Sequence, residues 1–313
     1  MVRLFFSTDV HGNEKCWRKF VNAGEYYDAD VLILGGDLTG KMIQPIIQQP
    51  SGGWKYYRGG KELFLGDEDE LSRHEKELEF SGIYPYRTTF EEAEKLAANE
   101  EARKQVFLQA QIETLARWFQ FAQEKLGNRT IYLAPGNDDD FVIDSVLERY
   151  EVAMNCEGKV VWVDDQHEMI SSGWTNPTPW KTFREQSEES LAERIESMAS
   201  KVEDVSSSIF ALHAPPYNTG LDEAPRLDTR TETFKMVGAD ETGAVGSKAV
   251  RSLIEKYQPL LGLHGHVHEG KGNARIGRTI CFNPGSVYTE GILNAAVIDL
   301  DKKRINRWFF ISG

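Results

Sequence analysis

Residues 5–13 read FFSTDVHGN. An apolar, β-prone run ends there in a polar cluster, so we expect Asp9 and His11 where a buried strand gives way to a loop. Four later segments follow the same plan: LILGGDL at 32–38, LAPGNDDD at 133–140, FALHAPPY at 210–217 and GLHGHVH at 262–268. Because open α/β sheets place their chemistry at the carboxyl ends of strands, the five segments predict one shared site.

The order of these segments resembles the motif series of the calcineurin-like metallophosphoesterase superfamily. That series is Asp-x-His, Gly-Gly-Asp, Gly-Asn-His-Asp/Glu, a lone His and Gly-His-x-His. The resemblance implies an α/β fold, namely a four-layer α/β/β/α sandwich of two sheets flanked by helices, with metals at one edge. It also implies a hydrolase that attacks phosphate esters with a metal-bridging hydroxide.

The resemblance assigns ligands to two metal ions. It implies that the first ion is held by Asp9, His11, Asp37 and His268, and the second by Asp37, Asn137, His213 and His266. Asp37 is then the bridge. Mixed Asp, Asn and His ligands suit manganese, iron, zinc or cobalt, bound as two divalent or mixed-valence ions.

The charge of this ligand set predicts its substrate. Two divalent ions bring four positive charges, and only Asp9 and Asp37 among the ligands are anionic, so a positive surplus remains even with a hydroxide bound. Metals also lower the pKa of bound water, and a pair about 3.5 to 4 Å apart can stabilise attacking and leaving oxygens together. A small-molecule phosphoester is therefore the expected substrate.

One residue departs from the superfamily pattern. Asp138 stands where a histidine usually contacts the phosphate or protonates the leaving group, and an aspartate, with a reference pKa near 3.9, is an anion at neutral pH. Asp138 and Asp139 remain candidate catalytic residues. The alternative for Asp139 or Asp140 is to cap a helix expected over 141–150. Leaving-group protonation would otherwise come from water, another residue or the substrate, which favours acidic leaving groups.

We interpret residues 1–313 as a single domain with an inserted segment. Strand-like runs alternate with helical patterns such as 14–26 and 246–257, which is typical of a layered α/β protein. The stretch 40–89 is too long for a bare loop and is predicted to form a cap beside the site, with a hairpin of 54–58 and 61–65. A helical segment then returns to the core by about residue 126.

Candidate substrate contacts lie outside the five segments. Trp54, in the cap, is a candidate for binding the organic part of the substrate, although packing of the cap is the favoured alternative. Arg226 and Arg230 are further candidates, with solvated surface roles as the alternative. The loop 173–184 is expected to wall the pocket, and residues 246–247 begin a helix whose free amides could hold phosphate.

Charge and cysteine content bound the partners and the compartment. A formal charge of −13 over 313 residues counts against a generic nucleic-acid or anionic-membrane binder. Cys16, Cys156 and Cys281 are scattered without CxxC spacing, which indicates a reducing compartment. No run approaches about 18 consecutive apolar residues and no leader pattern opens the chain, so a cytoplasmic protein that does not bind a membrane is expected.

Three functions fit these observations. The leading interpretation is a metal-dependent phosphoesterase that prefers a phosphodiester or nucleotide-like small molecule, because the usual histidine is absent. The first alternative is a catalytically weak or inactive metal-binding scaffold, for which Asp138 is the argument. The second is a nuclease, which would need a basic, aromatic groove that the acidic composition disfavours.

Overall fold

The computed structural model describes residues 1–127, 129–228, 235–236 and 241–313. Its first sheet has six strands in the order β20-β19-β1-β2-β7-β8. The four strands β1, β2, β7 and β8 run parallel, whereas β19 and β20 pair antiparallel at one side. The strand bounds are β1 (Val2–Ser7), β2 (Val31–Leu34), β7 (Ile131–Leu133), β8 (Ala153–Asn155), β19 (Asn294–Asp301) and β20 (Arg304–Ser312).

A second six-stranded sheet has the order β17-β18-β16-β11-β10-β9. Its four central strands are parallel and its two outer strands are antiparallel. The bounds are β9 (Val160–Trp162), β10 (Glu168–Ser172), β11 (Ile209–Leu212), β16 (Leu261–Leu263), β17 (Gly272–Ile276) and β18 (Thr279–Asn283). The central parallel strands β2, β11 and β16 are continuous apolar runs, as expected of strands covered on both faces.

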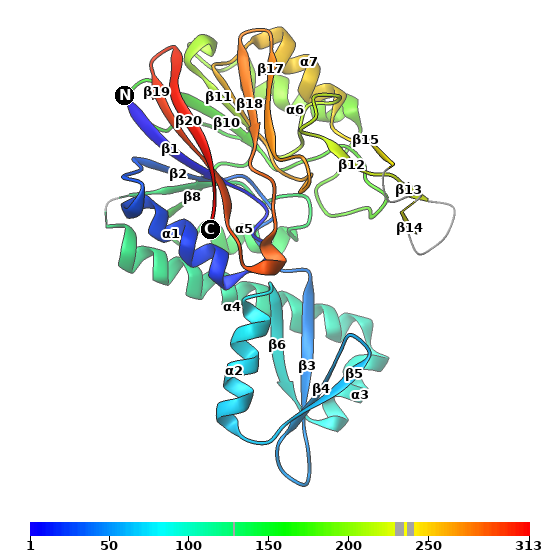
Figure 1. Cartoon of the computed structure of the whole chain (residues 1–313). Coiled ribbons are helices and arrows are strands. Elements are labelled where there is room, and N and C mark those ends of the chain that lie inside the picture. Colours follow the sequence, from blue (N-terminus) through cyan, green and yellow to red (C-terminus); the bar gives the residue numbers. More distant parts are fainter. Residues whose placement is uncertain (128, 229–234, 237–240) are drawn as a thin grey trace.

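The two sheets pack face to face, with helices outside them (Figure 1). Leu4 and Ile33 of the first sheet share a buried cluster with Ile209 and Leu263 of the second. Two further clusters cover the outer faces, one beneath α1 (Glu14–Tyr26) and α4 (Glu100–Leu126), the other beneath α6 (Glu188–Ala199) and α7 (Lys248–Tyr257). The order helix, sheet, sheet, helix confirms the predicted four-layer α/β/β/α sandwich.

The segment between β2 and β7 builds a small lobe of its own, which projects from the sandwich in Figure 1. Its sheet has the order β5-β4-β3-β6, and the predicted hairpin is present. Ile46, Tyr56, Leu71 and Leu78 form a separate buried cluster beneath α2. The bounds are β3 (Met42–Gln48), β4 (Trp54–Arg58), β5 (Lys61–Leu65), α2 (Glu68–Glu79), β6 (Ile83–Thr88) and α3 (Phe90–Ala98), so we call it the 42–98 lobe.

Two predicted helices differ from the structure. The helical segment after Thr89 is broken at Asn99, because the Asn99 side chain accepts a hydrogen bond from the Ala102 amide and starts α4 anew. The helix expected over 141–150 is only a 3-10 turn, η1 (Phe141–Ile143), and a single α-turn, α5 (Asp144–Leu147).

The remaining short elements are η2 (Val205–Ser207), η3 (Tyr288–Glu290), β12 (Glu223–Pro225), β13 (Leu227–Asp228), β14 (Lys235–Met236) and β15 (Thr242–Ala244). Across the residues that the structure describes, no helix combines the length and apolar character needed to cross a membrane. All three cysteines are buried and free.

Candidate metal centre

The seven predicted ligands follow five strands that end at adjoining sheet edges. Asp9 and His11 follow β1, Asp37 follows β2 and Asn137 follows β7, and these strands are neighbours in the first sheet. His213 follows β11, and His266 and His268 follow β16, its neighbour in the second sheet. Parallel strands present their carboxyl ends together, which brings the loops into one place. We call Asp9, His11, Asp37, Asn137, His213, His266 and His268 the ligand cluster.

The backbone of this cluster is held in an uncommon conformation. Asp9, His11, Asp37 and His266 have φ values of 53°, 41°, 50° and 66°, in the left-handed region that residues other than glycine seldom adopt. Hydrogen bonds between loops hold it: Asp9 N–H donates to the Gly36 carbonyl at 3.0 Å, and His11 N–H donates to the Asp37 carbonyl at 3.0 Å. Such strain gathers at functional sites, where surrounding contacts impose it.

One side of the cluster joins the first and the last motifs. His11 Nε2 lies 3.1 Å from His268 Nε2, and Asp9 Oδ1 lies 3.4 Å from the same His268 nitrogen. Ligand atoms of these three residues all lie within 4.8 Å of one another. Two imidazole nitrogens and a carboxylate that face one another at this spacing could hold a metal ion.

The other side is built around Asp37 and His213. His213 Nε2 lies 3.5 Å from Asp37 Oδ1 and 3.9 Å from Asp9 Oδ1. Its Nδ1 lies 2.8 Å from the Gly35 carbonyl oxygen, which can only accept, so Nδ1 carries the proton and Nε2 points at the carboxylates. A backbone carbonyl that fixes the imidazole in this way is a common partner of metal-binding histidines.

Four buried atoms of the cluster have no hydrogen-bond partner among the described residues: Asp9 Oδ1, His11 Nδ1, Asn137 Oδ1 and His213 Nε2. Leaving a buried polar atom unpaired costs free energy, so native proteins seldom do it without a reason. Each atom belongs to a side chain that the sequence predicts to be a ligand. The donor set therefore fits metal ions.

The electrostatics of the cluster favour a bound cation. Burial raises the pKa of Asp9 and of Asp37, but His213 and the neighbouring histidines together outweigh burial and hold both pKa values below the usual range. Burial lowers the pKa of His213, but Asp37 and Asp9 outweigh it and raise that pKa to about 9. Two ionised carboxylates thus lie in a buried pocket and draw positive charge to it.

Comparisons with known proteins agree with this architecture. No protein-family model matches the sequence. Uncharacterized protein MJ1162 of Methanocaldococcus jannaschii is 28% identical over 167 residues, which cover 51% of this chain and 68% of that protein. One solved crystal structure aligns over 97% of both chains with a TM-score of 0.58 and 16% identity. The crystal structure of TT1561 of Thermus thermophilus covers 100% of this chain and 98% of its own, with a TM-score of 0.54 and 13% identity.

The five motifs, in order, therefore meet at the edge of a two-sheet sandwich that solved proteins share. This chain has the fold of these solved structures, the four-layer sandwich that its resemblance to the calcineurin-like metallophosphoesterases implies. The late segment Asn283 to Ser286 supports the ligand cluster. Asn283 Nδ2 donates to the carbonyls of Gly265 at 3.3 Å and Val267 at 2.9 Å, and Ser286 Oγ donates to the Asp9 carbonyl at 2.7 Å. The first and the last of the five motifs are thereby fixed relative to each other.

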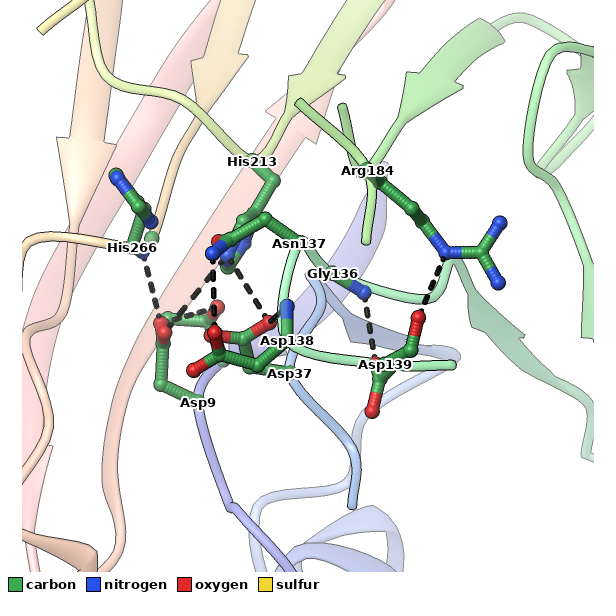
Figure 2. Close-up of polar contacts among 12 residues, drawn as sticks. Asp9, Asp37, Gly136, Asn137, Asp138, Asp139, Arg184, His213 and His266 are labelled. Carbon is green, nitrogen blue, oxygen red and sulfur yellow. Dashed lines mark hydrogen bonds and ion pairs between the residues drawn. The ribbon is translucent and has the colours of Figure 1, made fainter. Parts of the chain in front are cut away.

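His266 lies in the ligand cluster in a different way from the other histidines. Its ring contacts the His213 ring, with centroids 5.4 Å apart, and its backbone N–H donates to Asp9 Oδ2 at 3.0 Å, as Figure 2 shows. Among the described residues, however, its imidazole is in none of the three groups of His, Asp or Glu side chains that close to within 4.8 Å. Its role as a ligand stays a prediction.

Asp138 occupies the position of the usual motif histidine. Its backbone N–H donates to Asp37 Oδ1 at 3.0 Å, and its carboxylate forms an ion pair with Lys41 (Figure 2 shows Asp138 beside Asp37 and Asn137). Burial and Asp37 raise the pKa of Asp138 to about 6, against the opposing effect of Lys41. The carboxyl is then mostly ionised at pH 7. Lys41, four residues after Asp37, had no role in the sequence interpretation.

Asp139 is the other candidate catalytic residue, and backbone hydrogen bonds within the fold engage its carboxylate. Its carboxylate accepts hydrogen bonds from the amides of Leu38 at 2.9 Å, Thr39 at 2.8 Å and Gly136 at 2.8 Å. These bonds tie the Gly-Gly-Asp loop to the Gly-Asn loop. Asp140 is the helix cap, because Oδ1 accepts from the Val142 amide at 3.0 Å. We therefore assign Asp139 a positioning role in place of the catalytic one.

The predicted substrate contacts lie away from the cluster or outside the described residues. Trp54 packs against the buried cluster of the 42–98 lobe, and the Arg87 guanidinium lies 5.7 Å from its ring centroid, so its surroundings match the packing alternative. Arg226 is exposed, and its backbone N–H donates to the Glu241 carbonyl at 2.7 Å. Arg230 falls outside the described residues.

The predicted phosphate site at the start of α7 is already filled by a side chain. The Glu188 carboxylate accepts from the amides of Lys248 at 3.0 Å and Ala249 at 2.8 Å, and from the Ser247 hydroxyl at 2.6 Å. A carboxylate satisfies the free amides of a helix start as phosphate would. The expectation of a phosphate site there was wrong, because the sequence did not reveal that Glu188 packs against α7.

The loop 173–184 contributes a relay that the sequence analysis missed. Asn137 Nδ2 donates to Thr182 Oγ1 at 2.8 Å, and the Thr182 hydroxyl donates to Glu185 Oε1 at 2.6 Å. Asn137 Nδ2 also donates to Asp138 Oδ1 at 3.2 Å, so the amide nitrogen is engaged and the oxygen is left as the candidate ligand atom. Burial raises the pKa of Glu185, but hydrogen bonds from Thr178 and Thr182 outweigh burial and lower it.

We expect Thr182→Val to weaken metal binding about 10- to 100-fold, because Asn137 then loses the shorter of the two hydrogen bonds that orient its amide. Thr178→Val is the matched control, since the Thr178 hydroxyl also donates to Glu185 Oε1 at 2.6 Å but does not touch Asn137. Titration of the metal-free variants with Mn²⁺ in a calorimeter would measure the difference. Equal losses in both variants would show that the relay supports only the loop.

Proposed function

We propose that the protein is a metal-dependent phosphoesterase whose ligand cluster holds two metal ions bridged by Asp37. The observation that carries the proposal is the meeting of four unpaired, buried atoms of candidate ligands, from Asp9, His11, Asn137 and His213, at one sheet edge. Manganese, iron, zinc and cobalt all suit such a mixed oxygen and nitrogen donor set.

The residues of the chain prepare the site for a phosphate ester. When bound, two such ions would lower the pKa of coordinated water and stabilise negative charge on the phosphoryl oxygens. The Gly35 carbonyl keeps His213 in the tautomer that leaves Nε2 free, and Thr182 keeps the Asn137 oxygen free. These fixed directions mean that little reorganisation is needed when a ligand binds.

A phosphodiester or a nucleotide-like small molecule is the substrate class that we favour. The carboxylate of Asp138 stands where a histidine would protonate the leaving group, which favours esters whose leaving group needs little help. The net charge of −13 argues against a nuclease that tracks a long anionic backbone. We also propose that the 42–98 lobe acts as a cap, since Tyr84 Oη accepts from the Gly40 amide at 2.6 Å, three residues after Asp37.

The test is hydrolysis of bis(p-nitrophenyl) phosphate beside p-nitrophenyl phosphate. Purified protein would be reconstituted in turn with manganese, iron, zinc and cobalt, with Asp37→Ala as the blank. We expect metal-dependent turnover that the blank lacks and a higher kcat/KM for the diester. The absence of turnover with every metal, despite stoichiometric metal binding, would favour the inactive scaffold. A preference for the monoester would contradict the substrate class.

A further inference from the structure

Lys41 lies at the edge of the ligand cluster, where the β2 loop leads into the 42–98 lobe. Its ammonium pairs with the Asp138 carboxylate, and the Lys41 side chain is 46% exposed, whereas that of Asp138 is 16% exposed. The ammonium thus lies between the buried cluster and the solvent. Asp138 is the chain neighbour of the ligand Asn137. Among the described residues, no other ion pair brings a Lys or Arg side chain to the ligand cluster or to a residue next to it in the chain.

The pair is fixed on the carboxylate side. The Asp138 amide donates to Asp37 Oδ1 at 3.0 Å, and an Asp138 oxygen lies within 4.8 Å of ligand atoms of both Asp37 and His11. Lys41 also lies close enough to Asp37, His11 and His268 for its charge to act on them. A cation is therefore held beside Asp138 and close to Asp37, the carboxylate that both metal ions would share.

Charge at this position decides whether phosphate can approach. An unpaired Asp138 carboxylate would repel an incoming phosphoryl group, and Lys41 cancels that charge. An ammonium has three N–H donors, and an ion pair with one carboxylate leaves donors free on the exposed side. Because the Lys41 side chain is 46% exposed, these free donors remain accessible to a second oxygen.

We propose that Lys41, oriented by Asp138, is a substrate-binding residue that donates a hydrogen bond to a nonbridging phosphoryl oxygen of the ester. The pair supplies, from two distant parts of the chain, the cationic phosphate contact that a single histidine would otherwise supply. The inference rests on the proposed function, because it places the phosphoryl group at the same cluster.

The test measures binding of inorganic phosphate to the manganese-loaded protein by calorimetry, with metal content determined in parallel. We expect Lys41→Met to keep its manganese and to weaken phosphate binding roughly 10- to 100-fold, as the loss of a charged hydrogen bond should. Lys41→Arg should retain most of the affinity. Lys256→Met is the control, since Lys256 Nζ pairs with Glu196 Oε1 at 2.7 Å on exposed helices.

Phosphate affinity in Lys41→Met equal to that of wild type, with manganese retained, would overturn the assignment. If Lys41→Met loses manganese, the double variant Asp138→Asn/Lys41→Met is measured next. It also removes the Asp138 carboxylate that Lys41→Met leaves unpaired, and so separates phosphate binding from charge neutralisation. Restored manganese with weak phosphate binding supports the contact, whereas full recovery of both shows that Lys41 only neutralises Asp138. Lys41-dependent phosphate binding without any ester turnover would count against the proposed function and leave the Lys41 contact supported.

Discussion

Replacement of Asp37 by asparagine is expected to reduce metal binding and turnover more than about 100-fold, because it removes the charge of the proposed bridge. Changes to groups that merely orient a metal ligand cost about 10- to 100-fold, so loss of the bridging charge should exceed that range. The substitution keeps the shape of the side chain, and its oxygen can still accept the hydrogen bond from the Asp138 amide. Metal content and kcat/KM, measured on the same preparation, give the result.

Asp28→Asn is the matched control for this change. Asp28 has a φ of 51°, close to the 50° of Asp37, but it is exposed and lies at the end of α1. The same substitution in the same backbone conformation should there leave metal content and activity unchanged. An Asp37→Asn protein that binds metal and turns over substrate like wild type would contradict the bridging role.

Gly136→Ala is expected to disrupt both stability and metal binding. A Cβ at Gly136 would lie 2.1 Å from Asp37 Oδ1 and 2.2 Å from the Asp37 amide nitrogen, so the Gly-Asn loop or the bridging side chain must move. Figure 2 shows Gly136 beside the Asp139 carboxylate that anchors this loop. Overpacking of this kind costs about 1–3 kcal/mol. Thermal unfolding with and without Mn²⁺ would measure the loss.

Gly66→Ala is the control for the steric argument. Its Cβ would lie 3.7 Å from Glu70 Oε2, an ordinary contact distance, and Gly66 is not in the left-handed region. We expect its unfolding midpoint to stay near that of wild type. A Gly136→Ala protein with an unchanged unfolding midpoint and full metal content would contradict the steric argument, because the Asp37 loop would then accommodate the added Cβ.

The strand ends of the site were predictable from sequence because their signal is local. An apolar run that stops at a polar group, as at Leu34 before Asp37, marks a strand end wherever it occurs. The parallel order of the strands then brings distant strand ends together. The lobe was predictable only as far as its hairpin, since the parallel pairing of β3 with β6 joins segments that share no turn.

The partners of the site residues were not predictable, because they depend on contacts between distant parts of the chain. Thr182 is 45 residues from Asn137, and no spacing rule links a hydroxyl to an amide over that distance. Lys41 and Asp138 meet only because the β2 and β7 loops lie side by side. The short turn after Asp140 was mistaken for a longer helix because its acidic start resembles a helix cap.

The proposed function requires that the cluster hold two metal ions in one chain. Calorimetric titration of the metal-free protein with Mn²⁺, with bound metal counted afterwards by mass spectrometry, measures this number. We expect two ions per chain for wild type and a loss of binding in Asp37→Asn. Binding of no metal by the wild-type protein, or equal binding by Asp37→Asn, would contradict the proposed function.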